Sequence, residues 1–357
     1  MMYGDKAAPT ISVAIPTHNR QELLRRVLAA LAKQTYPMDQ FEVIVVVDGS
    51  DDGTEEMLKA LQNPYELRVL QQPQGGPSRA RNVAIAAARG QVIIFLDDDV
   101  IPVPQFVSTH AAIHQHDPEA VVVGRLLAYP IGERPGWERW EEFDLDQQFD
   151  QMREGRLVLN GTHFYTGNAS VGRRSLAIVG NFDVALKYQE DCDLGQRLEM
   201  AGAHFYFGDR AAGYHCGYRA SFSIWCRRHY NFGVYNFVRH NRNGDGQLPA
   251  ALRDARARLR PVTKLLLTVA IGRPIVSQLM TTSIHGIVTT ADWLHAWSIS
   301  RCGYSALVNL HHWWGIHDAL GAHAYPSSIG NADVVTEPRQ SWTPDGVPSP
   351  GLSNGRG

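Results

Sequence analysis

Three consecutive aspartates, Asp97, Asp98 and Asp99, directly follow an apolar run of the sequence. Three adjacent carboxylates repel one another, which is costly unless a cation offsets their charge. Hard oxygen ligands suit Mg²⁺ or Mn²⁺, and such ions usually keep few protein ligands and complete their shell with substrate phosphate. The cluster therefore predicts a divalent-cation site, with a solvated acidic turn as the simpler alternative. Because side chains alternate along a strand, we expect Asp97 and Asp99 on one side and Asp98 on the other.

Two further polar segments also follow apolar runs. They are 16–20, with the sequence PTHNR, and 48–54, with the sequence DGSDDGT. In an open parallel sheet, ligands collect beyond the carboxyl ends of the strands, where the strand order reverses. Asp48 can accept an N–H of a nucleobase or a ribose hydroxyl, while Gly49 and Gly53 permit turns that residues with a Cβ resist. Together with the aspartates, these segments predict a nucleotide site. Capping of the next helix by the acidic residues of 48–54 is compatible with it.

The elements that must position these residues alternate between strand and helix patterns. Such alternation implies right-handed β-α-β crossovers and a parallel sheet, so the first half is predicted to be an open α/β domain. One run, 41–47, is almost continuously apolar, and we expect both of its faces to be covered. The expected strands are 11–15, 41–47, 67–70 and 91–96, and the expected helices are 21–33, 55–62 and 78–89.

The pattern changes after residue 181. A helix is expected at 190–200 and a short strand at 204–207, followed by an aromatic and basic segment at 221–241. Two apolar stretches, 262–271 and 275–297, contain enough polar residues to favour buried or interfacial helices over membrane spans. The expected organisation is a nucleotide-sugar-binding catalytic domain over 1–215, a helical region over 216–325 and a disordered Pro-, Gly- and Ser-rich tail over 326–357.

The composition excludes several classes of protein. Lys and Arg total 34 against 36 Asp and Glu, a formal charge of −2, whereas nucleic-acid binding needs a basic face. The four cysteines include no C-x-x-C pair, which argues against a disulfide scaffold and a structural zinc site. The first residues contain no apolar run typical of a signal peptide. We therefore expect a cytoplasmic protein that does not bind nucleic acid.

Five motifs occur in the order seen in family 2 glycosyltransferases, which the chain resembles over residues 10–215. They are PTHNR at 16–20, VDGSDDGT at 47–54, ARN at 80–82, FLDDD at 95–99 and EDCDLGQRL at 190–198. The resemblance implies a GT-A fold, a Rossmann-like open mixed sheet that is mainly parallel and flanked by helices, here with a C-terminal helical extension. It implies transfer of a sugar from a nucleotide-diphosphate donor, with UDP favoured, and inversion at the anomeric carbon. The acidic cluster corresponds to the family's D-x-D element, which usually holds Mg²⁺ or Mn²⁺.

The resemblance also assigns roles to single residues. The nucleotide-binding residues would be Pro16, Thr17, Arg20, Asp48, Arg79, Arg81, Asp97 and Asp98. The metal ligands would be Asp97, Asp99 and His215, although a structural role for His215 is an equal alternative. Gly167 and Asn168 would border the donor sugar and the acceptor, with a plain tight turn as the alternative. For Arg79 and Arg81, the alternative is an exposed charge on an Ala-rich helix.

The pair Glu190 and Asp191 opens the expected helix at 190–200. The helix dipole alone favours acidic residues in a first turn, which is the structural alternative. The resemblance places the catalytic base here, because inversion needs a carboxylate that takes the acceptor's proton on the side opposite the departing diphosphate. We expect Asp191 to be the base. Glu190 is the second candidate and would also contact the donor sugar.

Competing functions leave different signatures. A non-catalytic nucleotide-sugar-binding module would lack an acidic motif, and none is missing. An NAD-dependent oxidoreductase would carry G-x-G-x-x-G after a strand, which this sequence lacks. A nucleotidyltransferase is the nearest enzymatic alternative, but it would open with a Gly-rich phosphate loop rather than with 16–20.

The sequence does not identify the acceptor or the oligomeric state. The Q-x-x-R-W element of processive synthases is missing, so we expect transfer of one or a few sugars. The acceptor is a small molecule, a glycan or a lipid-linked molecule, and the oligomeric state is unassigned. A minority hypothesis is that Arg227, Arg228 and Arg239, beside the apolar stretches, contact an anionic membrane surface.

Overall fold

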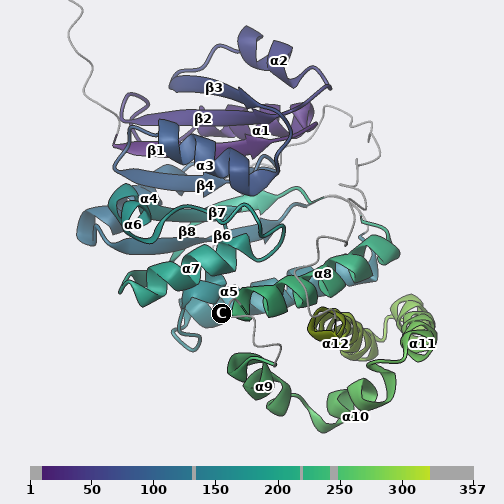
Figure 1. Cartoon of the computed structure of the whole chain (residues 1–357). Coiled ribbons are helices and arrows are strands. Elements are labelled where there is room, and N and C mark those ends of the chain that lie inside the picture. The colour runs from purple at the N-terminus through teal and green to yellow at the C-terminus, as the bar shows by residue number, and fades with distance from the viewer. Residues whose placement is uncertain (1–9, 131–133, 218–219, 242–247, 322–357) are drawn as a thin grey trace, which may run out of the picture. The chain divides into compact units, whose positions relative to one another are not determined.

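The apolar runs of the first half become the central strands of a mixed eight-stranded sheet (Figure 1). This computed structural model describes residues 10–130, 134–217, 220–241 and 248–321, so the expected tail over 326–357 lies outside the described residues. The strands are β1 (Ile11–Thr17), β2 (Phe41–Asp48), β3 (Glu66–Gln72), β4 (Val92–Leu96), β5 (Val100–Pro102), β6 (Ala120–Ala128), β7 (Asn168–Gly172) and β8 (His204–His215). Every strand and helix expected in the first hundred residues is present, with ends shifted by at most two residues.

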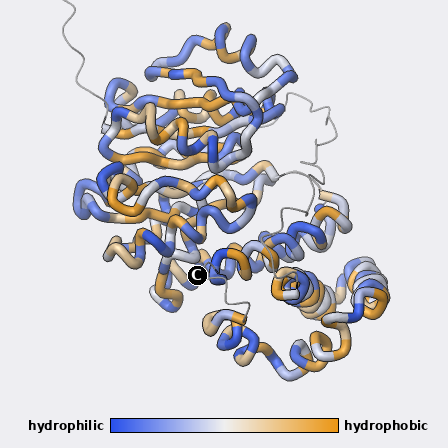
Figure 2. The backbone as a smooth tube through the Cα atoms, in the orientation of Figure 1, coloured by the Kyte–Doolittle hydropathy of each residue, from blue (hydrophilic) through white to orange (hydrophobic). Residues whose placement is uncertain are grey.

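Helices cover both faces of this sheet. One face packs against α1, α2 and α4, and the other packs against α3, α6 and α7. All eight residues of β2 are buried, as its continuous apolar run predicts, and Figure 2 shows the central strands as hydrophobic along most of their length. The helices of this part are α1 (Gln21–Leu31), α2 (Thr54–Ala60), α3 (Pro77–Ala87), α4 (Phe106–His116), α5 (Gly136–Arg153), η1 (Gly161–His163), α6 (Arg173–Val179) and α7 (Glu190–Met200).

The strand order is β3-β2-β1-β4-β7-β6-β8-β5. The first four strands run parallel, but β7 is antiparallel to both β4 and β6. This insertion pairs Leu96, the last residue of β4, with Asn168, the first residue of β7. The segment before Asn168 therefore lies beside the acidic cluster that follows Leu96.

Strand β8, near the far edge of the sheet, also reaches the acidic cluster. It runs parallel to β6 and, at its end, antiparallel to β5, so that His215 pairs with Val100. The sequence predicted only 204–207 of this strand, because the residues that follow Phe207, GDRAAG, are either small or charged. Their ladder to β6 and β5 extends the strand to His215.

The chain after β8 is helical, as expected, and its helices are α8 (Phe222–His240), α9 (Ala250–Ala257), α10 (Pro261–Ala270), α11 (Pro274–Trp293) and α12 (Trp297–Gly321). Trp225 of α8 packs with Val288 of α11 and Tyr304 of α12 in a buried cluster. Of the three cations in the membrane hypothesis, Arg239 is buried and Arg228 is paired with Glu141, whereas Arg227 is exposed. Over the described ranges, no helix has both the length and the apolar character that a membrane crossing requires.

Candidate active site

The three aspartates lie in a turn rather than on a strand. Strand β4 ends at Leu96, and the N–H of Val100 donates to the carbonyl of Asp97 at 3.1 Å. Arg20 Nη1 donates to both Asp98 Oδ1, at 3.0 Å, and Asp99 Oδ2, at 2.8 Å. The expected alternation, with Asp98 facing away from its neighbours, is therefore wrong, because it assumed that the strand continues through the cluster.

The last residue of β1 and the loop that follows it hold the buried pair Asp98 and Asp99. Thr17 is 3% exposed, and its hydroxyl donates to Asp98 Oδ2 at 2.7 Å. Burial and the charge of Asp99 raise the pKa of Asp98, although Arg20 and Thr17 act in the opposite direction. Burial alone would also raise the pKa of Asp99, but His215 and Arg20 outweigh it and lower that pKa. Thr17 and Arg20, both expected at the nucleotide, thus fix the carboxylates of the turn.

Arg81 joins the acidic turn to the helix that carries the candidate base. Its side chain is only 6% exposed, with Nη2 2.8 Å from Asp97 Oδ1 and Nη1 3.0 Å from Glu190 Oε1. Arg79 is exposed on α3, whereas the burial of Arg81 contradicts the alternative of an exposed charge for that residue. A guanidinium presents donors in a fixed fork, so it can hold two carboxylates in one orientation.

Glu190 and Asp191 open α7 in a largely buried setting. Burial and the neighbouring charge of Asp191 raise the pKa of Glu190 to about 7, against the opposing effect of Arg81. Burial also raises the pKa of Asp191, although an N–H from Cys192, at 2.7 Å, and the charge of Arg81 favour its ionised form. Carboxylates with raised pKa values suit proton transfer near neutral pH.

Asp48 organises the loop between β3 and α3. Its Oδ1 accepts from Gln72 Nε2, at 2.6 Å, and from the N–H of Gly75, at 2.7 Å, while Oδ2 accepts from the N–H of Gly76 at 2.8 Å. Gly76 precedes α3 with a φ of 88°, which favours glycine. Asp48, expected at the nucleobase, therefore holds the start of the helix that carries Arg81.

Side chains without an expected role join the loop after β1 to the loop after β2. His18 Nδ1 lies 2.7 Å from the carbonyl of Asp48, and Asn19 Oδ1 accepts from the N–H of Asp51 at 2.8 Å. Asp52 accepts from the N–H groups of Gln21 and Thr54, which are the first residues of α1 and α2. The N-cap position of α2 is Gly53, so Asp52 does not cap this helix as expected but bonds its first N–H from one residue further out. The PTHNR motif was the available signal for His18 and Asn19.

The donors that a divalent cation would need are partly assembled. Asp99 Oδ1 has no hydrogen-bond partner among the described residues. His215 Nε2 lies 3.6 Å from Asp99 Oδ2. In the part of the chain that the structure describes, no three acidic, histidine or cysteine side chains already form a ligand group. These residues fit an ion that takes few protein ligands and completes its shell with phosphate oxygens and water.

The segment before β7 supplies a glycine at the acidic turn. A Cβ on Gly167 would lie 3.0 Å from Asp97 Oδ2, so the absence of a side chain keeps this carboxylate accessible. Asn168 is different, because it is fully buried and its Nδ2 donates to the carbonyls of Arg125 and Ala211. His110 lies 3.1 Å from its Oδ1. The expected contact of Asn168 with sugar hydroxyls is corrected: its amide is already bonded within the core.

Comparisons with known proteins point to one family. Residues 12–179 match the model of glycosyl transferase family 2. The chain is 31% identical over 241 residues to an uncharacterized glycosyltransferase of Bacillus subtilis, YfnE, covering 54% of this chain and 61% of that protein. It is 29% identical over 270 residues to glycosyltransferase AglE of Haloferax volcanii, covering 74% and 81%. It is 31% identical over 220 residues to validoxylamine A glucosyltransferase of Streptomyces hygroscopicus subsp. jinggangensis, covering 54% and 52%.

These matches differ in how much of each relative they span. The chain covers about half to three fifths of the length of YfnE and of the validoxylamine A enzyme. Among solved structures, the mannosyltransferase PcManGT from Pyrobaculum calidifontis, in complex with GDP-Man and Mn²⁺, superposes with a TM-score of 0.59. The two chains are 19% identical, and the superposition covers 87% of this chain and 90% of the other. The expected GT-A fold, with a helical C-terminal part, is confirmed.

Proposed function

We propose, from the match of residues 12–179 to the model of glycosyl transferase family 2, that the chain is an inverting glycosyltransferase. It moves a sugar from a nucleotide-diphosphate donor to an acceptor hydroxyl by a single displacement, without processive polymerisation. UDP is the favoured nucleotide, and GDP is the alternative because PcManGT was solved with GDP-Man. The four cysteines are all free thiols, which fits the reducing cytoplasm that we propose as its compartment.

The donor side of the reaction rests on the acidic turn. Asp97 and Asp99, with His215, would hold the divalent cation, and Asp99 Oδ1 is the oxygen left without a partner among the described residues. When bound, the cation neutralises charge that develops on the diphosphate as it leaves. Gly167 leaves room beside Asp97 for the donor. The loop around Asp48 would receive the nucleoside.

The acceptor side rests on the first turn of α7. Asp191 would take the proton of the acceptor hydroxyl as that oxygen attacks the anomeric carbon. Glu190 is held in place by Arg81. Holding both substrates in line removes much of the entropic barrier to displacement.

One observation carries the proposal: Arg81 bonds simultaneously to Asp97 and Glu190. A buried guanidinium spans only a few ångströms between the carboxylates it bridges, so the donor-side and acceptor-side acids face a common region. A module that only binds nucleotide sugars has no need for a carboxylate pair with raised pKa values at that region.

The test is a screen of UDP- and GDP-sugars with the full chain. Release of nucleoside diphosphate is followed in Mn²⁺, in Mg²⁺ and with a chelator, because such enzymes often hydrolyse their donor slowly without an acceptor. We expect release with one donor, dependent on the metal. Asp99→Asn is expected to weaken metal-dependent donor binding in calorimetry, whereas Asp191→Asn retains donor binding and loses turnover.

Two outcomes would contradict this assignment. Release of pyrophosphate instead of nucleoside diphosphate would identify a nucleotidyltransferase. Metal-dependent donor binding without turnover, for every donor and with a panel of acceptors that includes lipid-linked sugars, would identify a binding module.

A further inference from the structure

The last helices present an apolar face that the rest of the described chain does not cover. Six large apolar side chains of α10 and α11 are 57–78% exposed: Val262, Leu265, Ile275, Leu279, Ile287 and Trp293. On α11, Leu279 and Trp293 follow Ile275 by four and eighteen residues, close to whole numbers of 3.6-residue turns, so the three share one side of the helix. We call these six residues the α10–α11 face.

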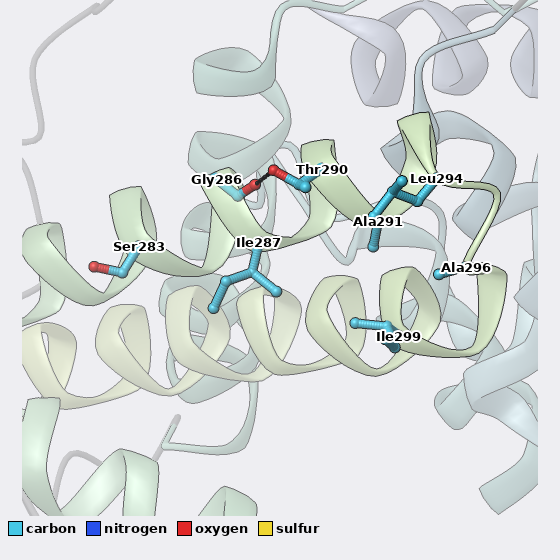
Figure 3. A pocket seen from close by; sticks show the side chains of 8 residues that line it. All are labelled: Ser283, Gly286, Ile287, Thr290, Ala291, Leu294, Ala296 and Ile299. Carbon is cyan, nitrogen blue, oxygen red and sulfur yellow. Dashed lines mark hydrogen bonds between the residues drawn. The ribbon is translucent and has the colours of Figure 1, made fainter.

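A shallow groove widens this face toward α12. It has a volume of about 470 Å³ and lies between α11 and the first turn of α12 (Figure 3). Ile287, which belongs to the α10–α11 face, lines the groove together with Ala291, Leu294 and Ile299. The apolar surface therefore continues from one helix to the next, and contiguous exposed apolar surface of this kind marks an interaction site.

The segment that leads into this face is strongly basic. Between residues 253 and 273 there are six cations and one acid, Asp254, a local excess of five positive charges in a chain whose formal charge is −2. The cations are Arg253, Arg256, Arg258, Arg260, Lys264 and Arg273, and all are exposed. Over the described residues, none of the six is within ion-pair distance of a carboxylate. Asp292, the acid of α11, faces inward toward Arg139 and Tyr304.

We propose that the α10–α11 face docks onto the surface of an anionic lipid bilayer. Apolar side chains on one side, cations beside them and an exposed tryptophan are the features of helices that lie in the membrane interface. Anionic headgroups complement the basic segment, while a protein partner would need an acidic rim of matching shape. This inference replaces Arg228 and Arg239, which the fold buries or pairs, with the cations of 253–273, and it stands independently of the proposed reaction.

The test is flotation of the full chain with vesicles. We use vesicles of phosphatidylcholine alone and vesicles that contain about 30% phosphatidylglycerol, because anionic lipid attracts basic segments. The chain is expected to float with the anionic vesicles and to stay largely in solution with the neutral ones. Raising the salt concentration is expected to weaken the binding, since salt screens exposed charges.

Two triple variants separate the apolar from the electrostatic contribution. Leu265→Ser, Leu279→Ser and Trp293→Ser together are expected to lower the partition coefficient at least roughly tenfold, since each removes apolar surface that the bilayer would bury. Their matched control is Ile178→Ser, Val184→Ser and Met200→Ser, at apolar residues that are 60–88% exposed elsewhere on the chain, and it is expected to bind as the wild type does. Arg258→Gln, Arg260→Gln and Lys264→Gln are expected to abolish the preference for anionic vesicles.

Three results would overturn the proposal. The first is an absence of flotation at low salt, which would leave the face to a protein partner. The second is equal loss of binding in the apolar variant and in its matched control, with unchanged thermal unfolding midpoints. The third is a dimer in light scattering that the apolar triple variant converts to a monomer, which would identify a second copy as the occupant.

Discussion

The guanidinium of Arg81 lies 3.0 Å from the carboxylate of Glu190, although 109 residues of sequence separate them. This contact fixes the first turn of α7 against α3. It also brings a positive charge to a carboxylate whose pKa is raised to about 7, mainly by burial. The orientation of the two candidate catalytic carboxylates, Glu190 and Asp191, therefore depends on a residue of a different helix.

Replacing Arg81 tests this dependence. Arg81→Met leaves the largely buried Glu190 and the partly exposed Asp97 without their cation. We therefore expect a loss of about 3 kcal/mol in the free energy of unfolding, the lower end of the range for a buried ion pair. Arg81→Lys keeps the charge but not the fork geometry and is expected to lie in between. Urea denaturation measures both. Arg25→Met, at an exposed helical ion pair, is the control, and an equal effect of the two methionine variants would show that the bridge contributes nothing special.

The pH dependence of turnover tests the base. Because burial raises the pKa values of Glu190 and Asp191 and a base acts in its deprotonated form, kcat is expected to rise with pH through the neutral range. Glu190→Gln removes one negative charge of the pair, so the acidic limb is expected to move to lower pH. Asp191→Asn is expected to remove turnover at every pH. A pH-independent kcat in the wild type would exclude this pair as the base.

Two histidines in the core predict acid sensitivity of the fold. Burial lowers the pKa of His110 to about 3 and that of His114 to about 4, and both rings bond to Ser170. The unfolded chain binds these protons below pH about 6.5, so their stabilisation is complete above that pH and is lost as pH falls toward 4. At pH 5, each histidine is expected to lower the free energy of unfolding by about 2 kcal/mol relative to neutral pH.

The check is the free energy of unfolding measured between pH 7 and 5. His114→Gln cannot take up a proton and is expected to remove roughly half of the acid sensitivity. His116→Gln, at an exposed position of the same helix, is expected to leave the sensitivity unchanged. Identical pH profiles for His114→Gln and the wild type would contradict the assignment.

A buried carboxylate at the opposite end of the sheet predicts a large mutational effect on stability. Glu42 is fully buried and accepts hydrogen bonds from Ser12, Arg68 and Arg89. Burial alone would raise its pKa, but these bonds outweigh it and lower that pKa. Glu42→Ala leaves both cations without this partner, so we expect a loss of about 3 kcal/mol.

Glu66→Ala is the matched control for Glu42→Ala, because Glu66 also pairs with Arg89 but is half exposed. An exposed pair is worth less than about 1 kcal/mol. In addition, the contribution of Glu42 is present above the pKa of an unfolded glutamate, about 4.3, and is lost as pH falls below it. Equal losses for the two variants, measured by thermal unfolding, would refute the buried ion pair.

The strands and helices around the candidate site were predictable because their patterns are local. The continuous apolar run of β2 and the helical spacing in α1 depend only on neighbouring residues. The antiparallel insertion of β7 was not predictable in the same way, since its five residues, NASVG, are mostly small and include a single β-branched residue. Its place is set by pairing with β4, more than seventy residues earlier.

The sequence identified which residues gather at the candidate site better than it identified the hydrogen bonds between them. The spacing of Asp97, Asp98 and Asp99 identified the acidic turn, but only the end of β4 at Leu96 decides which carboxylates share Arg20. The expected sugar contact of Asn168 was wrong because a polar residue beside a glycine is typical of a loop. Its amide instead bonds three buried groups of the core. Such burial depends on partners that no local pattern reveals.

The pairing of His215 with Val100 limits how the length of the chain can vary. Each residue of a strand advances the chain by about 3.3 Å, so one residue inserted into β8 before His215 would carry the imidazole that far from Asp99, or turn it to the other face. Insertions at the turn before β8, around Gly202, where a Cβ would meet no neighbouring atom within 4 Å, leave that ladder unchanged. Related chains that keep the imidazole beside the aspartate are therefore expected to vary in length at that turn and not within the strand.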